Sequence, residues 1–191
     1  MYDFIPELFE LNDDKKFEQL MSRTHKYEEI TDRMEVEIAN YLTKVSENGM
    51  SLGASQEISA MLRIVDNLES IGDSCYQLSL TIDSKRKQNI AYSQEMNEKL
   101  QNMFSLVKEA VLEMNNNLSA NYHNVSIDRA KELENRINEY RHQLRTEHTE
   151  AVKQNQYPYQ TGISYSTLYA QCEKLADFAI NVTEAIDKIK K

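Results

Sequence analysis

The sequence predicts an all-α protein made of two tandem three-helix bundles, and three observations lead to this fold class. The chain has 4 glycines and 2 prolines in 191 residues, which favours long helices with few turns. From Met61 to Asp83, apolar residues recur three and four positions apart, a spacing that only a helix places on one face. The third observation is an internal repeat. A shift of 104 residues carries the apolar positions Ile64, Leu68, Ile71, Cys75, Leu78 and Ile82 onto Leu168, Cys172, Leu175, Ala179, Val182 and Ile186.

The repeat divides the chain into residues 1–86 and residues 87–191, each expected to hold three helices. The expected helices of the first half are 1–11, 15–46 and 56–83, with Pro6 in a first turn and a loop at 48–55. Those of the second half are 93–120, 126–152 and a last helix that follows a loop at 154–164, with Ser93 and Ser126 as N-caps.

The two halves differ in their first helix. Residues 93–120 can form about seven turns, whereas residues 1–11 can form only about three. The shorter helix is expected to leave the other two helices of its bundle partly uncovered. We therefore expect the chain to be a fragment of a longer protein or to be completed by a partner, with a homodimer joined through the first halves as the expected form.

Composition excludes several function classes. A net charge of −9 argues against nucleic-acid binding, which depends on Lys and Arg contacts to phosphate. No apolar run reaches the roughly 20 residues of a membrane span. The residues form no Ser–His–Asp or Cys–His pattern and no glycine-rich phosphate loop, so we expect no enzyme and no small-molecule substrate. Cys75 and Cys172, the two cysteines, lie on apolar seams and are expected to be buried, reduced thiols.

Acidic residues four apart recur on the second and third helix of each half. Such pairs project carboxylates from one helix face, and two neighbouring helices could together hold a hard cation or Fe, Mn or Zn. The alternative is that they are solvated surface acids. The second set is expected to bind more weakly, because Asn138 replaces an acid and Arg141 adds a cation. The candidate ligands are Glu28, Asp32, Asp66, Glu69 and Asp73 in the first half, and Glu134, Glu173 and Asp177 in the second.

The arrangement resembles the PhoU family of phosphate-signalling proteins. The segment Leu62–Asp73, LRIVDNLESIGD, is similar to the family's signature, and Glu28–Asp32, EEITD, is similar to the signature of its second helix. Ser74, Asn138 and Ala170 depart from the family pattern. The resemblance implies two tandem three-helix bundles and, in some members, multinuclear iron or zinc clusters at the acidic pairs.

The resemblance leaves three functions open. The short first helix favours a cytosolic regulatory domain of a bacterial sodium/phosphate cotransporter, which would lie at the inner membrane with its own transmembrane domain upstream. The alternative is a free-standing PhoU-type negative regulator of a phosphate ABC transporter and its two-component signalling. A carboxylate-bundle metal-binding protein is a second alternative.

Overall fold

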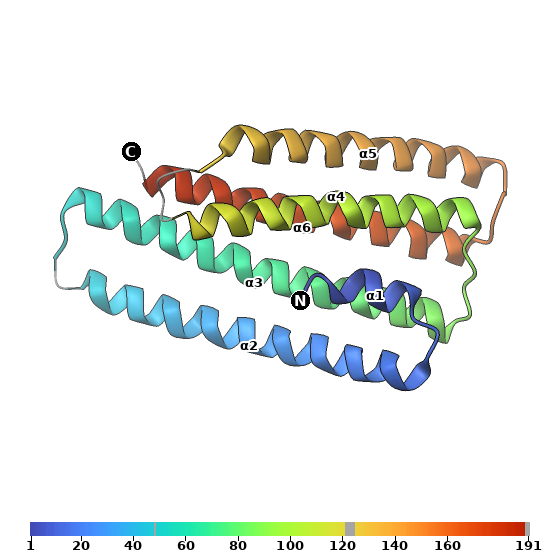
Figure 1. The fold of residues 1–191 in the computed structure, drawn as a ribbon, viewed down its shortest axis with the longest axis horizontal. Coiled ribbons are helices and arrows are strands. Elements are labelled where there is room, and N and C mark those ends of the chain that lie inside the picture. Colours follow the sequence, from blue (N-terminus) through green and yellow to red (C-terminus); the bar gives the residue numbers. More distant parts are fainter. Residues whose placement is uncertain (48, 121–124, 190–191) are drawn as a thin grey trace.

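A computed structural model describes residues 1–47, 49–120 and 125–189, and these residues form six helices (Figure 1). Within these ranges all regular secondary structure is helical, which confirms the predicted fold class. The helices are α1 (Phe4–Glu10), α2 (Asp14–Ser46), α3 (Leu52–Lys87), α4 (Gln94–Ser119), α5 (Ile127–Lys153) and α6 (Tyr159–Ile189). None of the helices in the described part of the chain is long and apolar enough to span a membrane.

Four long helices lie side by side in the order α2, α3, α6, α5, with the most extensive contact between α3 and α6 (Figure 1). Helix α1 packs on α2 and α3, and α4 packs on α5 and α6. Helices α1 and α4 lie on the same side of the row, because Tyr2 donates a hydrogen bond to the carbonyl of Phe104 and Phe9 packs edge-on against Phe104. The opposite side of the row carries no helix in the described residues.

A single apolar core runs through both halves, contributed by all helices of the row and by α1 and α4. Cys75 and Cys172 are fully buried free thiols within it, which confirms the predicted burial. Because the core is continuous, the division at residue 86 describes two sequence repeats that share one interior.

Gly72 fixes how closely α2 approaches α3. A Cβ atom added at Gly72 would lie 2.5 Å from Oγ1 of Thr31, which no pair of uncharged atoms tolerates without a shift. The hydroxyl of Thr31 donates a hydrogen bond of 2.8 Å to the carbonyl of Glu28. The close approach therefore sets the spacing of the two helices that carry the first set of acidic residues.

Three helix boundaries differ from the sequence prediction. Helix α6 begins at Tyr159 and includes Gly162, although residues 154–164 were expected to form a loop. Helix α3 begins at Leu52 and ends at Lys87, four residues earlier and four later than expected. Ser126 occupies the N-cap position of α5, but its side chain makes no capping hydrogen bond. In the loop expected at 48–55, Asn48 lies outside the described residues.

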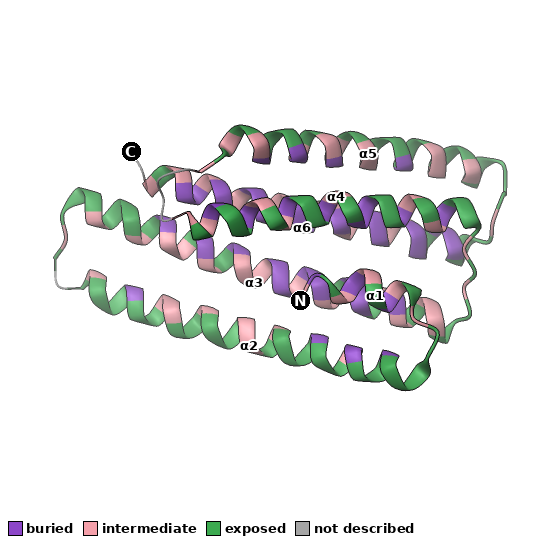
Figure 2. Cartoon of the chain, in the orientation of Figure 1, coloured by how far each residue is buried: buried purple, intermediate pink, exposed green. Residues whose placement is uncertain are grey.

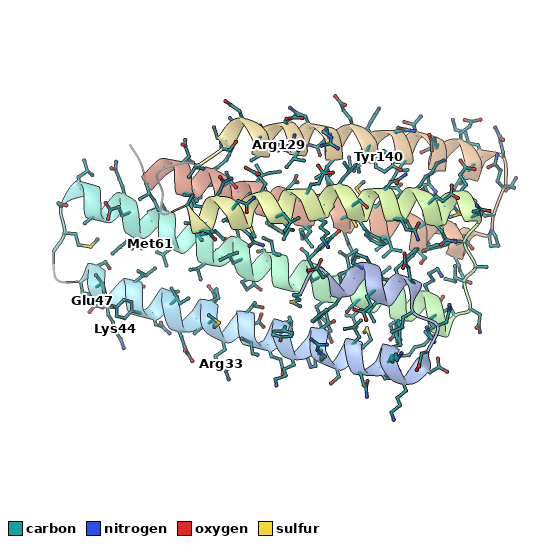
Figure 3. All side chains as sticks on the ribbon, in the orientation of Figure 1. Arg33, Lys44, Glu47, Met61, Arg129 and Tyr140 are labelled. Carbon is teal, nitrogen blue, oxygen red and sulfur yellow. The ribbon has the colours of Figure 1, made fainter. Side chains whose placement is uncertain are left out.

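Helix α2 is longer than α1, so the side of α2 that faces α1 is covered by α1 along only part of its length. Met34 is 51% exposed and Tyr41 is 67% exposed, and most of α2 is exposed in Figure 2. In the second half, the residue 106 positions after Met34 is Tyr140, whose hydroxyl bonds to the carbonyl of Lys99 in α4 (Figure 3). The second half thus covers with α4 a surface that the first half leaves exposed, as the difference in helix length predicts. We call the exposed surface of Met34, Tyr41 and Val45 the open groove.

Candidate functional site

The first acidic cluster lies along the contact between α2 and α3, on the side of the row that carries no covering helix. Tyr27 and Arg23 turn towards α1, where both contact the ring of Phe4. Helical geometry places Glu28 and Asp32 on the other side of the same contact. We define the first acidic cluster as Glu28, Asp32, Glu69 and Asp73.

Electrostatics show that these carboxylates act on one another. Partial burial raises the pKa of Glu28, and Asp32 and Asp73 raise it further. Partial burial also raises the pKa of Glu69, again with contributions from Asp32 and Asp73. The side chain of Glu28 is only 17% exposed. Glu28 and Glu69 therefore lie partly buried beside like charges, whereas Asp32 is exposed.

The nearest cation to this cluster is His25, one turn before Glu28. Its Nδ1 atom lies 3.4 Å from a carboxylate oxygen of Glu28, and its ring stacks on Tyr76 with a centroid distance of 5.1 Å. The side chain of His25 is 52% exposed and can compensate the carboxylates only when it is protonated. Asp66 is exposed and is not among the acids that shift the pKa of Glu28 or Glu69, so the structure places this candidate at the edge of the cluster.

The second acidic cluster repeats this arrangement between α5 and α6 with Glu134, Glu173 and Asp177. Burial raises the pKa of Asp177 to about 6, and the neighbouring Glu173 and Glu134 contribute to the rise. Arg141 enters the cluster and opposes the effect. Its Nε atom lies 3.9 Å from a carboxylate oxygen of Glu173, and it is the one fully covered side-chain nitrogen or oxygen in the described residues without a hydrogen-bond partner.

The two clusters offer different chemistry to a cation. The first presents carboxylate oxygens and one imidazole, a donor set that suits hard cations, iron and zinc. The second already contains the guanidinium of Arg141, a positive charge in the region of negative potential that a metal ion would otherwise occupy. In neither cluster, nor elsewhere in the described residues, do three acidic, His or Cys side chains already converge as metal ligands do. Metal binding would therefore require side-chain rotation, for which the exposed Asp32 has room.

Sequence reasoning missed two features of these clusters. The spacing of the acids identified the helix faces, but not that both faces border a helix–helix contact and are partly buried. The second missed feature is the raised pKa of Asp177, the largest upward shift among the carboxylates; the weaker metal binding expected of the second set stays a prediction.

Comparison of the sequence with curated proteins gives no match. The chain is similar in structure to the phosphate transport system regulatory protein PhoU from Streptococcus pneumoniae, with a TM-score of 0.73 and 15% sequence identity, over 98% of this chain and 86% of that protein. The family model of the PhoU domain matches residues 1–82, the half that contains the first acidic cluster. Residues 1–82 thus match the PhoU domain model, and the chain as a whole shares its fold with that regulatory protein.

Proposed function

We propose that this chain is a PhoU-type regulator of phosphate transport that acts through contacts with other proteins. The observation that carries the proposal is the likeness of nearly the whole chain to a protein described as regulating a phosphate transport system, together with the PhoU domain at residues 1–82. Its long helices offer extended surfaces for docking. We assign it a regulatory and not a catalytic role, in the cytoplasm, next to a phosphate transporter and its signalling proteins.

Of the two regulatory roles, the free-standing one is better supported. The structurally similar protein is a regulatory protein in its own right, and the present chain covers 86% of it. The role as a cytosolic domain of a sodium/phosphate cotransporter rests only on the short first helix. We therefore propose negative regulation of a phosphate ABC transporter and its two-component system.

Deletion of the gene in its host, followed by phosphate uptake assays with and without sodium, tests this role. We expect deletion to raise sodium-independent uptake and to derepress phosphate-starvation genes when phosphate is abundant, and we expect expression of the chain to reverse both. A change confined to sodium-dependent uptake would favour the cotransporter instead. Unchanged uptake and gene expression would refute a role in phosphate transport.

We further propose that the first acidic cluster binds a divalent or trivalent cation and that the second binds one weakly or not at all. The support is the raised pKa of Glu28 and of Glu69 in the first cluster, to which Asp32 and Asp73 both contribute, and the guanidinium of Arg141 in the second cluster. A cation that binds only the folded chain stabilises it by RT ln(1 + [L]/Kd), about 2.7 kcal/mol at a hundredfold excess over Kd.

Thermal melting with Mn, Fe, Zn or Ca against a chelator measures this effect. We expect a metal-dependent rise in Tm that the double variant Asp32→Asn, Asp73→Asn abolishes. Asp66→Asn is the matched control, because it removes an acid from the same helix at the edge of the cluster and should leave the rise in place. If no ion raises Tm and the double variant is more stable than the wild type, the acids of the cluster are solvated surface residues and do not form a metal site.

We also propose that the open groove is covered in a homodimer through the first halves. The groove continues the surface on which α1 already packs, and its residues are apolar, with Val45 42% exposed. Light scattering at tens of micromolar checks this state. Met34→Glu should produce monomers, whereas Leu112→Glu, a similarly exposed site on α4, should not. A monomeric wild type would contradict the dimer.

A further inference from the structure

A cavity outside both acidic clusters lies where the start of α4 meets the end of α5 and the start of α6. Its volume is about 720 Å³, within the range of sites for small organic molecules. Rings of Tyr92, Tyr157 and Tyr165 line it, together with the imidazole of His148. Aromatic faces dominate this wall, so a ligand here would be held by ring surfaces as well as by hydrogen bonds.

Tyr165 brings an unused hydrogen-bonding group to this cavity. The residue is only 4% exposed, and its ring packs edge-on against Tyr92 and Tyr169. Its hydroxyl has no hydrogen bond to any residue in the described part of the chain, although the hydroxyl of Tyr92 bonds to Ser164 at 2.6 Å. The Oη atom of Tyr165 is not fully covered by protein, and Tyr165 lines the cavity, so we infer that its hydroxyl opens into the cavity. The hydroxyl therefore offers a ligand in the cavity a hydrogen bond that no described protein group uses.

The charges around the cavity are mainly negative. Lys99 donates hydrogen bonds to Glu95 at 2.5 Å and to Glu147 at 2.6 Å, so one ammonium is shared between two carboxylates. The bond from Lys99 lowers the pKa of Glu147, which is therefore ionised at neutral pH. Partial burial lowers the pKa of His148, which is therefore neutral. Glu150 adds a further carboxylate to the lining.

We propose that this cavity binds a small organic cation carrying a guanidinium or ammonium group. The shared charge of Glu95 and Glu147 would hold the cation, the tyrosine rings would contact it through their faces, and the hydroxyl of Tyr165 would accept a hydrogen bond from it. The same aromatic wall already holds a cation on its outer side, where the ammonium of Lys85 lies 4.6 Å from the centre of the Tyr92 ring. Anionic ligands such as phosphate are disfavoured by the carboxylates.

Butylguanidinium and butylurea form a matched pair of probes, because they share size and shape and differ in charge. Calorimetry of the wild-type chain should show at least about tenfold tighter binding of butylguanidinium, the usual value of a charged over a neutral hydrogen-bonded contact. Amide NMR shifts should locate it at residues 92–99 and 147–165. Equal binding of the two probes, or shifts at the acidic clusters only, would overturn the proposal.

Three variants assign the binding to the residues named. Tyr165→Phe keeps the ring and removes the hydroxyl, and should weaken butylguanidinium about two- to tenfold. Glu147→Gln, on the partly exposed rim, should weaken it about tenfold or more. Glu109→Gln is the control, since Glu109 lies on α4 away from the cavity and pairs with Arg129 and Arg136. Unchanged affinity in both cavity variants, or equal losses in the control, would show that the cavity is not the site.

Discussion

Replacement of Gly72 by alanine tests how tightly α2 and α3 are held together beneath the first acidic cluster. The new methyl group would lie 2.5 Å from Oγ1 of Thr31. An interior helical Gly→Ala change alone stabilises a helix by about 1 kcal/mol. Overpacking in a contact of this kind costs about 1–3 kcal/mol. The two effects together predict a net loss of about 1 kcal/mol, or a fall in Tm of about 2–4 °C for a chain of this size.

Two further variants separate the clash from the change in helix propensity. Gly53→Ala lies in the first turn of the same helix, where a Cβ atom would meet nothing within 4 Å, so this variant should gain up to about 1 kcal/mol. In a Thr31→Ala background the nearest side-chain atom at position 31 would be its Cβ at 3.2 Å, and Gly72→Ala should then be close to neutral. Urea denaturation followed by circular dichroism measures all three. If Gly72→Ala is as stabilising as Gly53→Ala, the close helix contact inferred here is absent.

Three other predictions concern ionisation, reactivity and capping. The folded chain raises the pKa of Asp177 to about 6, so the stability that its protonated form provides is fully present below pH 3.8 and is lost as the pH rises through 6. Asp177→Asn should therefore raise the free energy of unfolding by about 1 kcal/mol at pH 7.5, allowing for the partial exposure of the side chain, and should flatten the dependence of the urea midpoint on pH. Cys75 and Cys172 should react with a thiol reagent only at the rate of global unfolding, and fast labelling of the native chain would contradict their burial. Asn117→Ala should cost about 1–2 kcal/mol in the same denaturation assay, because its side-chain oxygen accepts a bond from the amide of Ser126 at 2.9 Å, and an unchanged midpoint would refute that role.

The features that the sequence predicted well are those that depend on periodicity. The apolar seams identified the six helices and the repeat because burial requires one face of each helix to be apolar. Gly72, a glycine inside a predicted helix, marks a place where another helix comes close, and Thr31 is that neighbour. Such inferences need only the geometry of one helix and the energetic penalty of glycine within it.

The features that it predicted poorly depend on contacts between elements. The start of α6 was placed too late because Gly162 suggests a loop, whereas the structure uses that glycine to pack a helix against His148 and Tyr157, at 3.1 and 3.2 Å from its virtual Cβ atom. The proline at position 158, directly before the helix, was the better signal, since proline suits helix starts. The aromatic cavity joins three helices and two loops, and no single stretch of sequence contains its pattern.

Both repeats contain a pair of helices that carries an acidic cluster, α2 with α3 and α5 with α6, but the surroundings of the two pairs differ. In the second, Arg141 supplies a permanent cation to the acidic cluster, and α4 covers the opposite side of the pair. In the first, the cation beside the acids is His25, whose charge depends on pH, and much of the opposite side is open. Carboxylates without a permanent cation nearby can be neutralised by a bound cation, and exposed apolar surface can be covered by a partner. The metal ion and the dimer partner proposed above are therefore expected to bind the first repeat, whereas the second repeat supplies the cavity proposed for an organic cation.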